Sequence, residues 1–315
     1  MARAKGSRAQ LAVGFETTYG TPPAAGKFWR MPFVRSALGS TRGLLASNLL
    51  GYGRDEQDPV LDGQVVDGEV VVPMDQRGIG VWLKGLLGAP VTSGSGPYTH
   101  VFKSGAQTLP SMSIEVGMPE VPSYAMNKGV RVNTFSLEMR PRGLIDATVA
   151  LLAKGETKAS ATAAGTPVAI DAERFSAFNG SIKQDGVVLG NVVASSFSYS
   201  NQLEAIETIR DDGEIEDIDP GMVQLRGSIT VRYASRDLMD LAEAGTPIVI
   251  ELEYRKSANV SFRMVAHRVF LPKPKVPIEG PNGVQAEYAW QASKDATQGV
   301  AATFTLVNSQ PSYSL

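Results

Sequence analysis

A pattern that occurs twice in the chain constrains the fold more than any other feature. An alternating apolar segment beginning at Gly68 is followed by an amphipathic stretch and then by Gly-Ala-Pro at 88–90. A similar segment beginning at Gly227 is followed by an amphipathic stretch and by Gly-Thr-Pro at 245–247. The two patterns are offset by 159 residues at the first glycine and by 157 at the Gly-x-Pro. This agreement predicts two copies of one strand–helix unit.

Weaker matches flank both units in the same order. Upstream, Asp-Pro at 58–59 corresponds to Asp-Pro at 219–220, and downstream, residues 147–152 resemble residues 302–307. Between the halves, residues 154–167 are small, polar and aperiodic, as is typical of a linker or long loop. We therefore expect an internally duplicated chain whose halves have an ordinary domain size.

The periodicity of the apolar residues indicates the fold class. Residues 135–140, 228–233 and 250–254 alternate apolar and polar side chains, as antiparallel strands with one buried and one wet face do. Residues 75–88 and 235–245 instead carry apolar stripes at helical spacing. The predicted fold is mostly β with some α: two similar antiparallel β-sandwich or half-barrel domains, each with one flanking α-helix.

The expected domain organisation follows from these patterns. It comprises a basic extended N-terminal arm at 1–43, a first β domain at 44–155, a linker at 156–173, a second β domain at 174–308 and a C-terminal tail at 309–315. The arm carries seven Arg or Lys residues and one Glu, whereas the whole chain has a formal net charge of -2. The arm is either a solvated, partly disordered segment or a basic segment that docks on an acidic surface of a neighbouring copy.

The densest polar cluster is the acidic stretch at 211–219, which holds six carboxylates. Its spacing does not match the ligand pattern of an EF-hand loop. We interpret it as a solvated acidic loop or as a functional acidic surface. Such a surface either receives the basic arm or repels a polyanion.

The sequence offers little for catalysis. Cysteine is absent, which excludes disulfide frameworks, thiolate metal sites and cysteine nucleophiles. The two histidines, His100 and His267, lack metal-ligand spacing, and no phosphate-loop, dinucleotide or Gly-x-Ser-x-Gly motif occurs. No apolar run reaches the length of about 20 residues that spans a bilayer. We expect no enzymatic activity, no catalytic residue, no cofactor and no metal.

The opening stretch at 7–22, Ser-Arg-Ala-Gln-Leu-Ala-Val-Gly-Phe-Glu-Thr-Thr-Tyr-Gly-Thr-Pro, resembles the start of tail tube proteins of long-tailed phages. In that family a short strand is followed by a Glu-Thr-Thr-x-Gly-Thr-Pro turn. The resemblance continues through Arg-Asp-Glu at 54–56 and the strand–helix unit at 68–88. It implies a β-sandwich with a flanking helix, six of which form each ring. The sheets would join into a barrel around a channel, and rings would stack through loops and N-terminal arms.

The resemblance implies a structural virion protein that forms the hollow tail tube through which DNA passes into the host. It would reside in the phage tail after assembly in the host bacterial cytoplasm, without contact with a membrane. Its partners would be further copies of itself and other tail proteins, and DNA would pass without specific binding. Because a duplicated chain supplies two tube folds, we favour a trimeric ring with pseudo-six-fold symmetry over a hexamer whose second half lies outside the tube.

Charged residues at three places are candidates for inter-ring or channel contacts. They are Arg3, Lys5, Arg8, Arg54, Asp55, Arg210, Asp211, Asp212, Glu214, Glu216, Asp217 and Asp219. Two other functions share the strand pattern: a surface β-sandwich adhesin or carbohydrate-binding module, and another virion shell or tail component. A carbohydrate-binding module should cluster exposed aromatic residues, but Trp29, Trp82 and Trp290 are scattered along the sequence.

Overall fold

The computed structural model describes residues 3–278 and 280–315 and is mostly β, which confirms the predicted fold class. The first half contains helix α1 (Ile79–Leu87) and the strands β1 (Gln10–Phe15), β2 (Trp29–Arg30), β3 (Arg35–Ser36), β4 (Gly39–Leu45), β5 (Val60–Pro73), β6 (Val91–Ser93), β7 (Tyr98–Lys103), β8 (Met112–Met118), β9 (Ser123–Met139), β10 (Asp146–Ala153) and β11 (Gly155–Ala159). The second contains helix α2 (Asp237–Ala244) and the strands β12 (Val168–Ala169), β13 (Gly180–Gln184), β14 (Val187–Val188), β15 (Val192–Ser200), β16 (Glu204–Ile206), β17 (Asp217–Asp219), β18 (Gln224–Arg232), β19 (Ile248–Ser257), β20 (Val260–Phe270), β21 (Gln285–Ala292) and β22 (Ala302–Asn308). Short 3-10 turns lie at Gly6–Arg8 and Ala177–Asn179.

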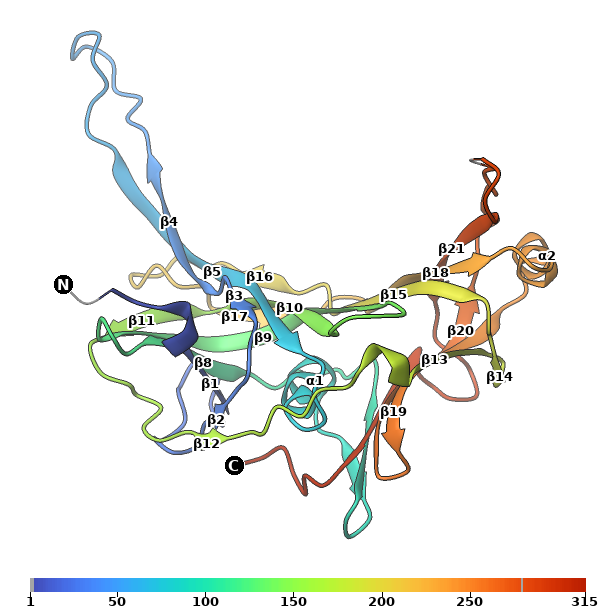
Figure 1. Ribbon diagram of the computed structural model, residues 1–315. Coiled ribbons are helices and arrows are strands. Elements are labelled where there is room, and N and C mark those ends of the chain that lie inside the picture. The colour runs from blue at the N-terminus through green and yellow to red at the C-terminus, as the bar shows by residue number, and fades with distance from the viewer. Residues whose placement is uncertain (1–2, 279) are drawn as a thin grey trace.

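One antiparallel sheet runs through both halves, which we call the main sheet. Its strand order is β4–β5–β10–β9–β15–β18–β21, so the pair β9–β15 joins the halves. A second layer packs against it, formed in the first half by β2–β1–β8–β9–β11 and in the second by β14–β13–β19–β20–β22. Figure 1 shows the main sheet across the middle of the molecule, with the β4–β5 hairpin projecting at one end and β21 and α2 at the other.

The core lies between the two layers and is continuous across the halves. Phe135 of the first half packs against Phe197 of the second, with ring centroids 6.0 Å apart, and Phe197 packs in turn against Phe304. In α1 every residue except Lys84 is buried, including Trp82. Burial of such large side chains supplies most of the stabilisation of a fold of this kind.

Within the described residues, seven strand pairs of the first half have counterparts in the second. The pairs in the first half are β1–β2, β1–β8, β8–β9, β9–β10, β9–β11, β4–β5 and β5–β10. The corresponding pairs in the second half are β13–β14, β13–β19, β19–β20, β20–β21, β20–β22, β15–β18 and β18–β21. In this correspondence β3 and β4 together are equivalent to β15, and the helix follows the equivalent strand in each half, β5 or β18.

The residue register repeats as well. A Cβ added to Gly68 would lie 2.3 Å from the carbonyl oxygen of Ala37, and one added to Gly227 would lie 2.1 Å from that of Ser196. Both the glycines and the residues that approach them are 159 positions apart. A side chain at either glycine would force the neighbouring backbone to move, so the glycine that opens each repeated pattern has the same steric reason to be there.

An irregularity in the second layer recurs at equivalent places. The β8–β9 ladder shifts register between Met112 and Ile114, and the β19–β20 ladder shifts between Ile248 and Ile250. These positions are separated by a constant 136 residues. A bulge is a specific feature of a strand pair, so its recurrence adds to the agreement in strand order.

Three expectations from the sequence are corrected by the structure. Residues 1–43 do not form an extended arm throughout, because the apolar run in β1 pairs with β8 and buries Leu11 and Val13. The expected linker 156–173 begins inside β11, which pairs with β9. Residues 147–152 correspond in topology to β21 rather than to 302–307, because β10 pairs with β5 as β21 pairs with β18.

The C-terminal segment 309–315 is docked on the first half. Tyr313 is buried, its carbonyl oxygen accepts a hydrogen bond of 2.9 Å from Lys84 Nζ, and its hydroxyl accepts one of 2.7 Å from Asn308 Nδ2. A Cβ on Gly80 would lie 2.0 Å from the Tyr313 ring, so the glycine in α1 makes room for it. Within the described residues, no helix has the length and apolar character needed to cross a membrane.

Candidate assembly surfaces

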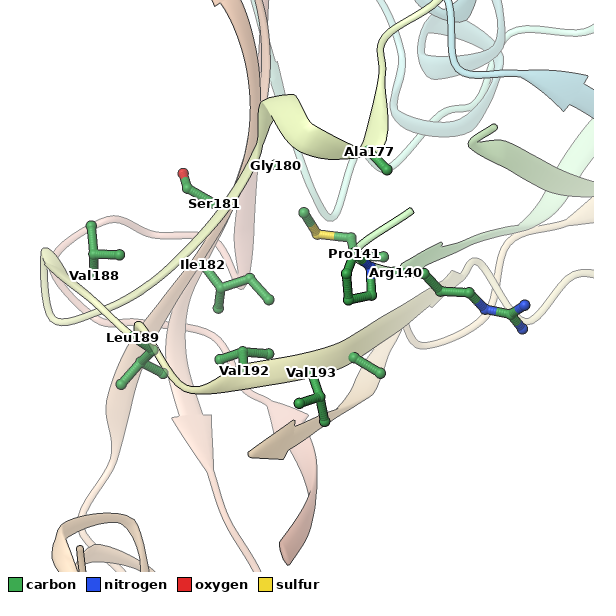
Figure 2. Close-up of a pocket in the computed structure, with 12 residues that line it drawn as sticks. Arg140, Pro141, Ala177, Gly180, Ser181, Ile182, Val188, Leu189, Val192 and Val193 are labelled. Atoms are coloured by element: carbon green, nitrogen blue, oxygen red, sulfur yellow. The ribbon is translucent and has the colours of Figure 1, made fainter. Parts of the chain in front are cut away.

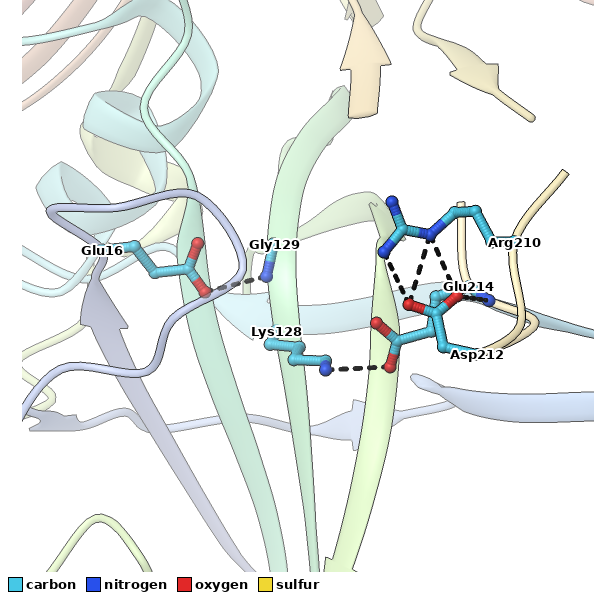
Figure 3. A network of polar contacts seen from close by, with 6 residues as sticks. All are labelled: Glu16, Lys128, Gly129, Arg210, Asp212 and Glu214. Atoms are coloured by element: carbon cyan, nitrogen blue, oxygen red, sulfur yellow. Dashed lines mark hydrogen bonds and ion pairs between the residues drawn. The ribbon is translucent and has the colours of Figure 1, made fainter. Parts of the chain in front are cut away.

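The acidic stretch 211–219 is folded onto its own chain. Lys128 Nζ of β9 lies 2.9 Å from Glu214 Oε1, and Arg131 of the same strand pairs with Asp217 at 3.1 Å. Figure 3 shows the first of these pairs beside the Arg210–Asp212 pair at the tip of the loop. These strand cations therefore partly neutralise the cluster.

The tip of this acidic loop is ordered by its own charges. Arg210 donates three hydrogen bonds to Asp212, two from Nε and one from Nη2, and Asp212 also accepts one from the Glu214 backbone N–H. The Arg210 guanidinium, with help from that N–H, holds the pKa of Asp212 well below its usual range. Among the described residues, no ion pair involves Asp211, Glu216 or Asp219, so these three carboxylates carry the remaining negative charge of the loop.

A turn near the N-terminus borders the same strand, β9. Glu16 accepts hydrogen bonds from the Gly20 and Gly129 backbone N–H groups, both at 2.8 Å, and from the Ser113 hydroxyl at 2.6 Å. Figure 3 shows the Glu16–Gly129 contact next to Lys128. Glu16 thus closes the Glu-Thr-Thr-Tyr-Gly-Thr-Pro turn and ties it to β8 and β9. Sequence reasoning identified this motif only as a resemblance and missed its structural partners, as it missed Lys128 and Arg131.

The basic residues before β1 form the remaining N-terminal part of the expected arm. Arg8 lies 3.6 Å from Glu120, and the Lys5 backbone N–H donates to the same carboxylate at 2.8 Å. The Arg8 side chain is largely exposed, and a surface pair of this kind contributes little to stability. Arg3 and Lys5 have no ion pair among the described residues and lie at the surface.

The β4–β5 hairpin projects from the body and carries Arg54 and Asp55 in the loop that joins its strands (Figure 1). This hairpin also exposes many apolar side chains. They are Leu44, Leu45, Leu49, Leu50, Tyr52, Val60, Leu61 and Val65. Such a concentration of exposed apolar surface on one projecting element marks an interaction site.

The face of the main sheet turned away from the core is rich in small hydroxyl groups. Ser136 and Ser198 are hydrogen-bonded across β9 and β15 at 3.0 Å, and Ser196 and Ser228 across β15 and β18 at 3.0 Å. This face, which we call the hydroxyl face, also carries Arg226, which lies opposite Ser198, and Arg232 at the end of β18. Two arginines on one strand do not make the continuous basic groove with stacking aromatic residues that binding of nucleic acid needs.

A small cavity of about 200 Å³ lies where the two halves meet (Figure 2). Its walls are mostly aliphatic, with Ile182, Leu189 and Val192 around it, while Arg140 at the rim pairs with Glu138 at 2.8 Å. Neither histidine lies there. Burial lowers the pKa of His100, which is held between the Thr92 hydroxyl and the Gln310 carbonyl oxygen. The described residues hold no group of three or more His, Cys, Asp or Glu able to bind a metal.

The expected contact residues thus fall into separate regions. The structure brings the acidic stretch together with β9, and leaves the basic residues of the N-terminus and of the hairpin loop elsewhere on the surface. Comparison of the sequence with protein families finds a match to the family described as phage tail tube protein, over residues 6–292. Comparison with curated proteins finds no match.

Proposed function

The chain belongs to the phage tail tube family, a family of structural tail proteins, and from that premise we propose that it assembles into stacked rings forming a hollow tube for DNA passage. Assembly takes place among newly made chains in the host bacterial cytoplasm and yields part of the virion tail. The repeated strand pairing carries the more specific part of the proposal. Each chain contains two tube domains, at about 10–159 and 180–308, rather than one domain with a decoration.

Two tube domains in each chain favour a ring of three chains with pseudo-six-fold symmetry. The join between the halves, β9 against β15, places two equivalent domains side by side in one main sheet. Repetition of that join by three chains gives six domains in a closed barrel, which removes the free edges that an isolated sheet exposes. A hexamer with the second half outside the tube would leave the continuous sheet without an explanation.

The hydroxyl face is the proposed channel lining. Serine and threonine side chains are neutral and short, so DNA can pass along them without the phosphate contacts that cause binding. Charged residues also lie on this face: Glu69 and Glu138 are paired with Arg35 and Arg140, and Arg226 lies opposite Ser198. Because arginines balance these acidic side chains, the proposal rests on the short hydroxyl groups and not on repulsion of the DNA backbone.

The stacking contacts are proposed to come from the β4–β5 hairpin and the residues before β1. The exposed apolar side chains of the hairpin need a partner surface, and a neighbouring ring provides one. Arg54 and Asp55 in its loop, with Arg3, Lys5 and Arg8 at the N-terminus, add charged contacts. Asp211, Glu216 and Asp219 are their candidate acceptors in a neighbouring copy, because they lack an ion pair within the described chain.

The test is negative-stain electron microscopy of the purified protein, combined with native mass spectrometry of the rings. Hollow rings of three chains with a six-fold outline are expected. Rings of six chains would contradict the trimer. Monomers alone at every salt and protein concentration would contradict self-assembly and favour a surface-binding module.

A further inference from the structure

The main sheet of one chain has two free edges, at opposite ends of the molecule. At one end, β3 and β4 have β5 as their one strand partner among the described residues. At the other end β21 pairs with β18 along its length but with β20 only at Gln291 and Ala292. The outer edge of β21 over 285–290 therefore has no strand partner in the described chain. Beside it the segment 271–278 runs without secondary structure, and a groove separates the two.

In the first half, the strand edge equivalent to the outer edge of β21 is that of β10, and it is paired. There, residues 134–139 of β9 pair with β15, and residues 134–137 also pair with β10 on the other side. Val130 of β9 lies opposite Met112, and its equivalent Val269 lies opposite Ile248, which gives an offset of 139 residues between β9 and β20. By this offset the segment 273–278 is equivalent to 134–139. In the first half, β15 lies beside residues 134–139. The equivalent of β15 is β3–β4, but the β3–β4 of the same chain lies at the end of the main sheet opposite to β21.

Resting on the proposed ring function, we propose that residues 273–278 of one chain close the main sheet against β3–β4 of a second copy, in the register that β9 and β15 adopt within each chain. Residues of β3–β4 and β15 are equivalent at an offset of 159, and residues of β9 and the segment 273–278 at an offset of 139. Applied to the pair Ser195–Met139, these offsets place Ser36 of one copy opposite Ile278 of the other. Leu38 likewise faces Val276, and Gly39 faces Lys275. The groove along β21 closes as the segment becomes a strand.

The side-chain pattern of the segment selects this register. Phe135, Leu137 and Met139 of β9 face the core, and their equivalents are Pro274, Val276 and Ile278. The alternate positions, Thr134 and Ser136, correspond to Lys273 and Lys275, which fall on the wet face. A slip of one residue would turn both lysines into the core. Ile278 is 80% exposed in the single chain, so pairing would also cover an apolar side chain that now lies in water.

The backbone donors fit the same register. The Asn201 N–H donates to the Asn133 carbonyl oxygen, so the bonded positions further along are Tyr199–Phe135 and Phe197–Leu137. Their equivalents between copies are Ser40–Pro274 and Leu38–Val276. Val276 is not a proline and so has an N–H to donate. The Leu38 N–H makes only a long contact of 3.4 Å to the Ser36 hydroxyl, so it can donate to the Val276 carbonyl oxygen of a second copy.

The prolines have a place in this arrangement. Pro274 has no N–H to donate, and the opposing Ser40 N–H is already held by Glu156 at 3.2 Å. Pro277 falls at the alternate position, where its missing N–H would have pointed toward β21. Prolines at 272, 274 and 277 reduce the number of N–H groups that the segment can offer to any neighbouring strand, which protects an open edge from indiscriminate association.

Engineered disulfides test the register, because the chain has no cysteine of its own. The pair Gly39→Cys with Lys275→Cys is equivalent to Ser198 and Ser136, whose hydroxyl groups lie 3.0 Å apart. A Cβ at Gly39 meets only Glu156, at 3.6 Å, so the substitution fits. The pair Ser136→Cys with Ser198→Cys is the control that closes within one chain. The pair Gly39→Cys with Lys273→Cys is the mismatched control, displaced by two residues.

After mild oxidation of assembled rings, the in-register pair should lose its monomer band on a non-reducing gel in favour of covalent dimer and trimer. The mismatched pair and the within-chain pair should keep theirs. Rings that cross-link equally at the mismatched pair, or at neither, would overturn this register and leave the tube function intact. If wild-type chains form no rings and no pair cross-links, both proposals fail together.

A second variant separates folding from closure. Ile278→Asp places a charge where the proposed strand is buried, although the side chain is exposed in the free chain. It should leave the monomer melting temperature unchanged and abolish rings. Val91→Asp is the control, because Val91 on β6 is similarly exposed, at 70%, and lies outside both edges of the main sheet. Rings from Ile278→Asp in wild-type yield would overturn the proposal.

Discussion

At the scale of single residues, one buried carboxylate determines how α1 begins. Asp75 is 1% exposed, and its Oδ1 accepts the backbone N–H groups of Arg77 at 2.9 Å and Ile79 at 3.1 Å. Burial raises the pKa of Asp75 to about 6, and it outweighs the opposing effect of these hydrogen bonds and of the Arg174 charge. The residue therefore organises the first turn of the helix at an electrostatic cost that depends on pH.

Asp75→Asn should remove this pH dependence. Because the pKa of Asp75 is higher in the folded chain than its ordinary 3.8, its stabilising contribution is complete below about pH 4 and is lost as the pH rises through about 6. Urea unfolding should thus show the wild type gaining about 1–3 kcal/mol relative to the variant on going from pH 7 to pH 4. If the free energy of unfolding changed equally with pH in the wild type and in Asp75→Asn, the raised pKa of Asp75 would be contradicted.

Asp75→Ala is the matched control for this effect. It removes the same charge but also the acceptor for two N–H groups at the start of α1. It should be less stable than Asp75→Asn by about 1 kcal/mol at every pH. The two variants together separate the capping contribution of Asp75 from the effect of its charge.

At the scale of elements, the N-terminal segment divides into two functional parts. Residues 10–15 form β1, which is almost wholly buried, whereas residues 3–8 lie at the surface with three basic side chains. Of these two described parts, the second is the one exposed for the proposed contacts between rings. The separation lies at Ala9, where the 3-10 turn at Gly6–Arg8 ends.

Two truncations should therefore behave differently. Deletion of residues 2–8 should leave the melting temperature close to that of the wild type. Its tubes should come apart at lower salt than wild-type tubes, because charged contacts between rings are lost. Deletion of residues 2–25 should prevent folding, because it removes β1 and the Glu16 turn. Circular dichroism measures folding, and counts of tubes across a salt series measure stacking. If deletion of residues 2–8 gave tubes of normal length that salt did not weaken, a stacking role for these residues would be contradicted.

The sequence allowed the elements to be predicted more fully than their partners. Alternation around 135–140 and 228–233 identified strands, and the common offset of Gly68 and Gly227 identified equivalent places, because both signals are local. Strand pairing is not local. Residues 147–152 resemble 302–307 in sequence because both are half-buried strands, yet β10 corresponds to β21 by its partner.

The same reason explains the missed site residues. The acidic stretch 211–219 was visible as a cluster, but its partners Lys128 and Arg131 lie more than 80 positions away in sequence. Nothing in the spacing of those two cations distinguishes them from other exposed charges on a strand. The expected arm at 1–43 failed for a related reason: its Gly and Pro content was read as irregular structure, whereas β1 gains its order from β8.

At the scale of the whole molecule, the two halves are interlocked rather than joined by a tether. The main sheet crosses from one half to the other at β9–β15, and a second crossing pairs β7 of the first half with β22 of the second. The β6–β7 hairpin follows α1 in the first half, whereas β19 follows α2 directly, so this second crossing uses an element without an equivalent. Separation of the halves would therefore expose two long strand edges and the aromatic cluster between them.

The interlocking predicts that both halves unfold together. Trp82 is buried in the first half and Trp290 in the second, so each reports on one half. Two variants isolate these probes: Trp29→Phe with Trp290→Phe keeps Trp82, and Trp29→Phe with Trp82→Phe keeps Trp290. Within each variant, the urea transitions followed by fluorescence and by far-UV circular dichroism should coincide, because no half has a complete sheet without the other. A fluorescence midpoint displaced from the circular dichroism midpoint would mean that one half is stable alone. In that case the contacts across β9–β15 would be too weak to hold the two halves at the fixed angle that the proposed three-chain ring requires.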